Sequence, residues 1–129
     1  MEVNELTERI IGAAVEVHRE LGPGLLESAY EACLAFEIAD SGLRVERQVL
    51  LPLRYRGRYL DCGYRLDLWV ERLVVVEAKA VTRIEPVHEA QLLSYLKLSS
   101  AKVGLIINFH VPLLKAGIKR MVLGLDEST

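Results

Sequence analysis

Three charged side chains interrupt two neighbouring stretches of the sequence that are otherwise largely apolar. Asp67 lies within residues 64–70, and Glu77 and Lys79 lie within residues 74–79. Burying an unpaired charge is costly, so each side chain needs a partner, a bound metal or access to solvent. The three residues therefore form either a functional cluster or an ordinary ion pair on a solvated sheet face.

The apolar residues around this cluster predict how the two stretches pair as strands. If residues 71–73 form a three-residue loop, Val70 opposes Val74 and Asp67 lies across from Glu77. Lys79 then shares their face, and the two Cβ atoms are about 5 Å apart. A two-residue loop would instead place Glu77 among apolar residues. In the favoured register the opposite face is wholly apolar and consists of Leu66, Leu68, Val70, Val74, Val76 and Ala78.

Two carboxylates at this spacing suit a hard divalent cation such as Mg²⁺ or Mn²⁺. A bound cation can polarise a phosphodiester and lower the pKa of an attacking water. The ammonium of Lys79 can hold that water or offset charge that develops on the phosphorane. The chemistry that this pattern favours is phosphodiester hydrolysis.

The elements that must position these residues follow from the periodicity of the apolar residues. Steps of three and four residues predict a helix from Leu6 to Leu21 and a second helix that ends at Ser41-Gly42. From Leu43 the period becomes two and predicts three strands in a meander, with turns at 55–58 and 71–73. A helix from Pro86 to about Leu98, a buried strand at 103–109 and a last strand at 119–125 complete the expected order. We therefore expect a single domain over residues 1–129, an α/β sandwich with a central mixed sheet and the order α-α-β-β-β-α-β(-β).

Composition excludes several classes of protein. The 129 residues are 51% hydrophobic and 26% charged, as in a compact globular domain. No stretch has the roughly 18 apolar residues of a membrane span, and the first residues do not resemble a signal peptide, so a cytoplasmic protein without a membrane partner is expected. Cys33 and Cys62 lack the spacing of a zinc site, and we expect both to be buried and unbridged.

Charge is unevenly distributed along the chain, although the net charge is only -2. Residues 44–72 hold seven arginines and four acids, and Tyr55 and Tyr59 alternate with three of those arginines, Arg54, Arg56 and Arg58. Arginine is well suited to phosphate, but alternating polar residues are also typical of a solvated strand. The segment is either a nucleic-acid contact or a solvated strand pair.

Four segments, in order, resemble the PD-(D/E)XK nuclease superfamily, whose fold is restriction-endonuclease-like. Asp67 followed after nine residues by Glu77-Ala78-Lys79 resembles the signature itself, with Arg65-Leu66 where a proline would precede the aspartate. Residues 24–30, GLLESAY, are similar to the GxxExxY motif that names a small family within the superfamily. Residues 91–96, QLLSYL, resemble the helix that follows the signature in RecB-like nucleases, and the strand 104–109 extends the similarity over nearly the whole chain.

The resemblance implies a Mg²⁺- or Mn²⁺-dependent nuclease that acts on nucleic acid, with DNA the expected substrate. It adds Glu27 to Asp67 and Glu77 as a metal ligand and implies that Gln91 orients substrate or a metal-bound water. Weaker candidates for substrate contact are Tyr30, Tyr95, Arg54, Arg56 and Arg58. Without the resemblance, Glu27 would be an exposed glutamate favoured by the dipole at a helix N-terminus.

Two other functions remain open at this point. The same fold could be a catalytically silent nucleic-acid-binding module, or a protein-interaction domain that uses its sheet edge or its apolar helices. No target-recognition element is visible in so short a chain. Specificity would therefore come from loops, from the arginine-rich turn, or from another protein, including a second copy of the chain.

Overall fold

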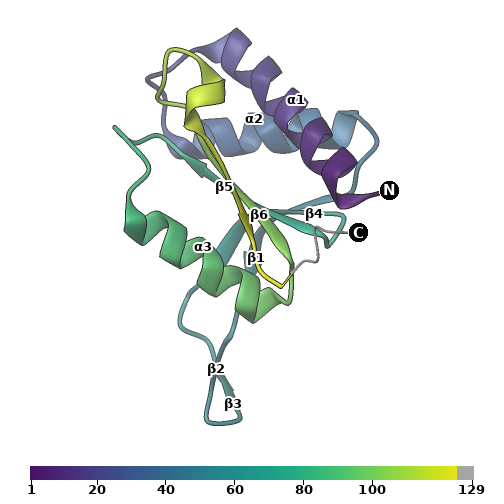
Figure 1. The fold of residues 1–129 in the computed structure, drawn as a ribbon, viewed down its shortest axis with the longest axis vertical. Coiled ribbons are helices and arrows are strands. Elements are labelled where there is room, and N and C mark those ends of the chain that lie inside the picture. The colour runs from purple at the N-terminus through teal and green to yellow at the C-terminus, as the bar shows by residue number, and fades with distance from the viewer. Residues whose placement is uncertain (125–129) are drawn as a thin grey trace.

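The computed structural model describes residues 1–124. A five-stranded sheet of order β1-β4-β5-β6-β7 lies between α1 and α2 on one face and α3 on the other (Figure 1). The elements in chain order are α1 (Val3–Leu21), α2 (Glu27–Asp40), β1 (Val45–Leu50), β2 (Leu53–Tyr55), β3 (Arg58–Leu60), β4 (Arg65–Val70), β5 (Val74–Lys79), α3 (Pro86–Ser99), β6 (Val103–Asn108), the 3-10 helix η1 (Leu114–Gly117) and β7 (Ile118–Val122).

The sheet is mixed, because β5 and β6 are parallel while the other neighbouring pairs are antiparallel. The chain from β5 to β6 crosses over through α3, as a parallel pair requires. This arrangement confirms the predicted α/β class and is consistent with a restriction-endonuclease-like fold. None of the helices within residues 1–124 combines the length and the apolar content that crossing a bilayer requires.

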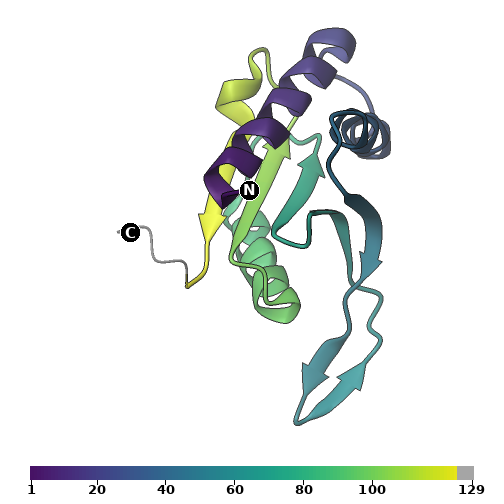
Figure 2. The same cartoon turned by 90° about the vertical axis from the view of Figure 1, so that its right-hand side faces the viewer.

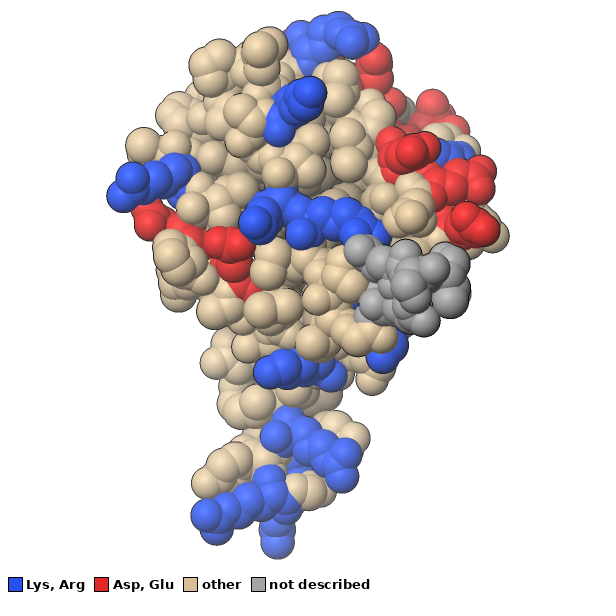
Figure 3. All heavy atoms as spheres, viewed as in Figure 1, with Lys and Arg blue, Asp and Glu red and all other residues tan. Residues whose placement is uncertain are grey.

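The expected three-strand meander is wrong in its middle part. β1 pairs directly with β4, while β2 and β3 form a separate two-stranded sheet that projects from the body (Figures 1, 2 and 3). The stretch 59–70 is therefore not one strand. It is divided where the Asp61 carboxylate accepts the N–H of Gly63, whose φ of 76° suits glycine and turns the chain.

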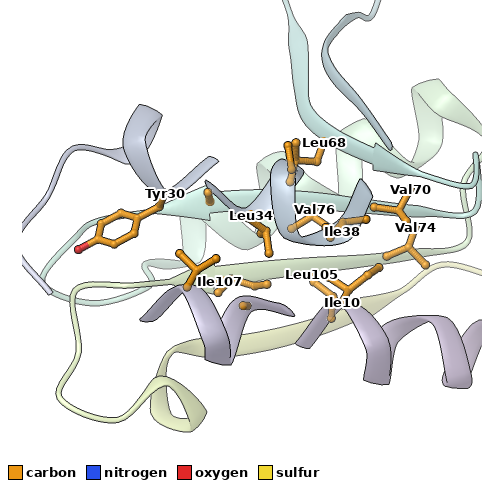
Figure 4. Packing of buried hydrophobic residues seen from close by; sticks show 14 of the residues in the cluster. Ile10, Tyr30, Leu34, Ile38, Leu68, Val70, Val74, Val76, Leu105 and Ile107 are labelled. Carbon is orange, nitrogen blue, oxygen red and sulfur yellow. The ribbon is translucent and has the colours of Figure 1, made fainter. Parts of the chain in front are cut away.

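The larger core lies between the sheet and the first two helices. Leu6, Ile10, Ala14 and Val17 face inward from α1 because their spacing of three and four residues keeps them on one side of the helix. Tyr30, Leu34 and Ile38 do the same from α2, and Figure 4 shows them, together with Ile10 of α1, beside the apolar residues of β4, β5 and β6. Burial on this scale fixes α2, which carries Glu27 and Glu31, against the sheet.

The smaller core lies between the sheet and α3 and contains Leu92, Tyr95 and Leu96 with residues of the opposite sheet face. All six residues of β6 are buried, as expected for a strand covered on both faces. Leu66 packs in this second core together with Leu51, and not with Leu68 as predicted. Regular pairing is interrupted at Asp67, so the alternation of faces does not continue through that residue.

Three smaller expectations have different outcomes. Cys33 and Cys62 are both free thiols, but Cys62 is exposed because it lies in the loop between β3 and β4, so its predicted burial is wrong. The last predicted strand is present as β7, which ends at Val122. Its expected end at Leu125 lies outside the described residues.

Candidate active site

The β4–β5 hairpin has the register that the apolar pattern predicts. Val70 pairs with Val74 and Leu68 with Val76, across a loop of three residues in which Glu71 and Arg72 have φ values of 53° and 54°. One step further along β4, Asp67 lies at the level of Glu77. The two carboxylates are thus brought together by the hairpin itself.

Regular strand pairing is replaced by side-chain contacts at this level. The Glu77 Oε2 accepts the backbone N–H of Asp67 at 2.9 Å, and the Asp67 Oδ2 accepts the backbone N–H of Ala78 at 3.0 Å. On the other side of β4, the pairing with β1 passes over Asp67 and Gln48, and the φ of Gln48, 52°, is left-handed. Asp67 and Glu77 therefore place their carboxylates between β4 and β5.

Both carboxyl groups have a raised pKa. Burial is the main cause for Glu77, which is 4% exposed; the charge of Asp67 adds to it, and the pKa reaches about 8. For Asp67, burial is again the main cause, the neighbouring carboxylate of Glu31 adds to it, and the pKa reaches about 6. The two groups titrate as a pair, so near neutral pH they hold a proton in the absence of a cation. Desolvation is a larger cause of both shifts than repulsion between the carboxylates.

Lys79 is half-buried at the end of β5, and its charge lowers the pKa of both carboxyl groups. The residue beside it in β6 is Asn108, which is almost fully buried. The Asn108 side chain accepts the N–H of Val81 at 3.1 Å and donates to the Val81 carbonyl at 2.9 Å. These two bonds hold the chain just after Lys79, where β5 leaves the sheet.

The acid that α2 places beside Asp67 is Glu31, and not Glu27 as predicted. Glu27 is exposed at the first turn of α2, where its Oε2 accepts the N–H of Ala80 at 3.0 Å. Glu31 lies about one helical turn further along the same face and is buried. Within residues 1–124, no three His, Cys, Asp or Glu side chains converge to form a metal-binding group. Asp67 and Glu77 thus lie next to each other, whereas Glu27 lies at the end of β5, where it binds the backbone of Ala80.

Two residues of β1 hold Glu31 in place. Arg47 donates from Nη2 to Oε2 at 3.0 Å, and Gln48 donates from Nε2 to Oε1 at 2.7 Å. A sequence signal for Glu31 exists, since it falls within the buried stripe of α2 formed by Tyr30, Glu31, Leu34, Ala35 and Ile38. A charge inside an apolar stripe is the same signal that identified Asp67 and Glu77 on the strands.

Gln91 and Tyr95 approach the site from α3 on a shared face, as predicted. The Gln91 Nε2 donates to the Tyr95 hydroxyl at 3.0 Å. Burial raises the pKa of Tyr95, and the charges of Glu77 and Asp67 raise it further, so the tyrosine lies close to both carboxylates. Gln91 itself is exposed, which leaves it accessible to a substrate.

The remaining candidates lie elsewhere. Tyr30 is 0% exposed, stacks on Phe109 and binds the turn after α1, where its hydroxyl donates to the Gly22 carbonyl and accepts the Leu25 N–H. Its predicted contact with substrate is therefore wrong. Tyr30 belongs to the buried stripe of α2 that packs in the core. Arg54, Arg56 and Arg58 are exposed on the β2–β3 hairpin.

Comparison with known proteins identifies one family. A sequence model described as the PD-(D/E)XK nuclease superfamily matches residues 4–121, a range that includes every residue of the candidate site. No curated protein and no solved structure matches the chain.

Proposed function

Because the chain belongs to the PD-(D/E)XK nuclease superfamily, we propose that it is a metal-dependent nuclease that hydrolyses phosphodiester bonds of DNA. The observation that carries the proposal is the Asp67–Glu77 pair. The buried carboxylate of Glu77 and the half-buried carboxylate of Asp67 lie together between β4 and β5, where backbone N–H groups orient them and a lysine lies next to them. Such a pair is unfavourable unless a proton or a cation offsets its charge.

The donor set fits a hard divalent cation, Mg²⁺ or Mn²⁺, since carboxylate oxygens are the ligands that these ions prefer. Asp67 and Glu77 would hold the cation, and Glu31 adds negative charge from the α2 side. When bound, the cation would supply Lewis-acid polarisation of the phosphodiester and acidify a water.

The other residues act on substrate and geometry. Lys79 places a point charge beside the carboxylates, where it stabilises negative charge that develops on the phosphoryl oxygens. Gln91 orients substrate or water with its exposed amide, and the Tyr95 hydroxyl fixes that amide. Glu27 is a positioning residue that holds the backbone of Ala80, directly after Lys79.

The proposal is tested by incubating plasmid and single-stranded DNA with the protein in Mg²⁺ or Mn²⁺, with EDTA as the metal-free control. Glu77→Ala and Lys79→Ala should each lower cleavage by about 100-fold or more, as loss of a group that stabilises the transition state does. Glu8→Ala and Lys97→Ala, which remove the same charges from exposed positions, should cleave like the wild type. Circular dichroism and melting curves establish that each variant is folded.

Two results would contradict the proposal. Metal-independent binding of DNA without any cleavage would favour the catalytically silent module. Neither cleavage nor binding would favour the protein-interaction domain, in which the charged cluster is only structural.

A further inference from the structure

Within residues 1–124, the β2–β3 hairpin, residues 53–60, has no strand partner outside itself. Its strands pair only with each other, and none of its residues belongs to either hydrophobic core. Residues 54–60 are all exposed, among them Tyr55, Tyr59 and Leu60. An isolated two-stranded ribbon is marginally stable in water, so these residues contribute little to the stability of the body.

The hairpin presents the same chemistry on both of its faces. Arg54 is the cross-strand partner of Tyr59, and Tyr55 is the partner of Arg58. Because neighbouring residues in a strand point to opposite faces, each face carries one arginine and one tyrosine. The Arg54 guanidinium lies 5.9 Å from the centre of the Tyr59 ring, within range of a cation–π contact.

A third arginine occupies the tip at a position that disfavours it. Arg56 and Gly57 form the two-residue turn with φ values of 49° and 79°, a conformation for which Asn, Asp and Gly are the low-cost residues. The long cationic side chain of Arg56 thus stands at the tip of the hairpin although its left-handed backbone conformation is unfavourable for arginine. Such a cost points to a role in binding rather than in folding.

The hairpin also differs in charge from the rest of the molecule. It contains three arginines and no acid, and Figure 3 shows blue and tan atoms but no red ones on it. Since the whole chain carries -2 and the hairpin +3, the remaining residues carry a net charge of -5. A polyanion would be repelled by the body and attracted by the hairpin.

We propose that the β2–β3 hairpin is an arm that enters the major groove of double-stranded DNA and binds the phosphates on both walls. This inference rests on the proposed function for its choice of a nucleic acid. Cations on both faces and at the tip suit a partner that surrounds the ribbon, whereas a flat partner would meet one face alone. The major groove of B-DNA, about 12 Å wide, admits a two-stranded ribbon, but the deep and narrow major groove of duplex RNA does not.

The test compares two triple variants that lower the net charge equally. Arg54→Gln/Arg56→Gln/Arg58→Gln removes the arm charges, and Lys97→Gln/Lys102→Gln/Lys115→Gln removes three exposed charges of the body. Affinity for a short B-form DNA duplex is measured in EDTA over a range of NaCl concentrations. Three lost phosphate contacts at about 0.9 each should lower the slope of log affinity against log salt by about 2.7 in the arm variant. Between about 50 and 200 mM salt, wild-type affinity should then fall about 40-fold more than that of the arm variant.

The body variant should keep the wild-type slope, and both variants should keep the wild-type melting temperature. Equal loss of slope in the two variants would overturn the proposal, because it would show an effect of net charge alone. So would an arm-dependent slope that is as large on single-stranded DNA or duplex RNA as on duplex DNA. Because binding is measured in EDTA, where metal-dependent cleavage does not occur, the result for the hairpin does not depend on the result of the cleavage assay.

Discussion

Glu77 is the residue whose surroundings depart furthest from those of an ordinary surface glutamate. It is buried in the middle strand of the sheet, it accepts a backbone N–H from β4, and its nearest charged neighbours include a second carboxylate. Transfer of a carboxylate from water into such a site is unfavourable, so the folded protein holds a proton there that the unfolded chain releases.

This proton makes the stability of the metal-free protein depend on pH. The Glu77 pKa rises on folding from an ordinary 4.5 to about 8, so the stability it contributes is fully present below 4.5 and is lost as pH rises through about 8. Glu77→Gln keeps a side-chain oxygen for the Asp67 N–H but does not titrate. In EDTA, the melting temperature of the wild type should fall more steeply than that of Glu77→Gln between about pH 5 and pH 9. Parallel curves for the two proteins would show that Glu77 carries no proton in the folded state.

At the scale of secondary structure, the β2–β3 hairpin is an insertion between two strands that already pair. The N–H of Leu51 donates to the carbonyl of Tyr64 at 2.8 Å, so the chain enters and leaves the hairpin at one point on the body. Leu51 is buried in the smaller core, while the exposed residues begin at Pro52. The β1–β4 pair should therefore fold without the hairpin.

Replacing residues 52–63 with Asn-Gly tests this independence. The two residues can form a tight turn between Leu51 and Tyr64, since Asn-Gly is the preferred pair for such a turn. We expect a melting temperature equal to or slightly above that of the wild type, because a shorter loop costs less entropy to close. Affinity for duplex DNA should fall to that of the arm variant. A loss of cooperative unfolding would instead mean that the hairpin is part of the core.

The sequence predicted the elements that form through contacts between residues close together in the chain, and it did not predict those that depend on contacts between distant residues. The helices and the β4–β5 hairpin depend on periodicity and on a three-residue loop, so local pattern was sufficient for the Asp67–Glu77 pair. The pairing of β1 with β4 joins strands that are separated by the whole hairpin, and no local pattern favours it over a meander. Glu31 stands out as a charge inside the apolar stripe of α2, but its place beside Asp67 depends on the packing of α2 on the sheet, which no local pattern predicts.

At the scale of the whole molecule, metal binding and folding should be linked. A cation that binds the folded protein alone raises its stability by about 2.7 kcal/mol when free metal is near one hundred times its dissociation constant. Mn²⁺ or Mg²⁺ should therefore raise the melting temperature of the wild type, and the rise should shrink in Glu77→Ala, which lacks one of the two proposed ligands. Matched additions of NaCl separate this effect from ionic strength. An identical response of both proteins to Mn²⁺ would mean that the pair is not a metal site.

The contacts that hold Asp67 and Glu77 also determine how ready the site is for a ligand. Each carboxylate uses one oxygen, Oδ2 or Oε2, to accept a backbone N–H of the neighbouring strand. The rotation of both side chains is therefore restricted by the sheet, and the second oxygen of each has a set direction. Ordering a flexible side chain costs up to about 1.5 kcal/mol when binding must do it. Here the torsional freedom of both carboxylates is lost as the protein folds, so an arriving ligand finds their oxygens already preorganised.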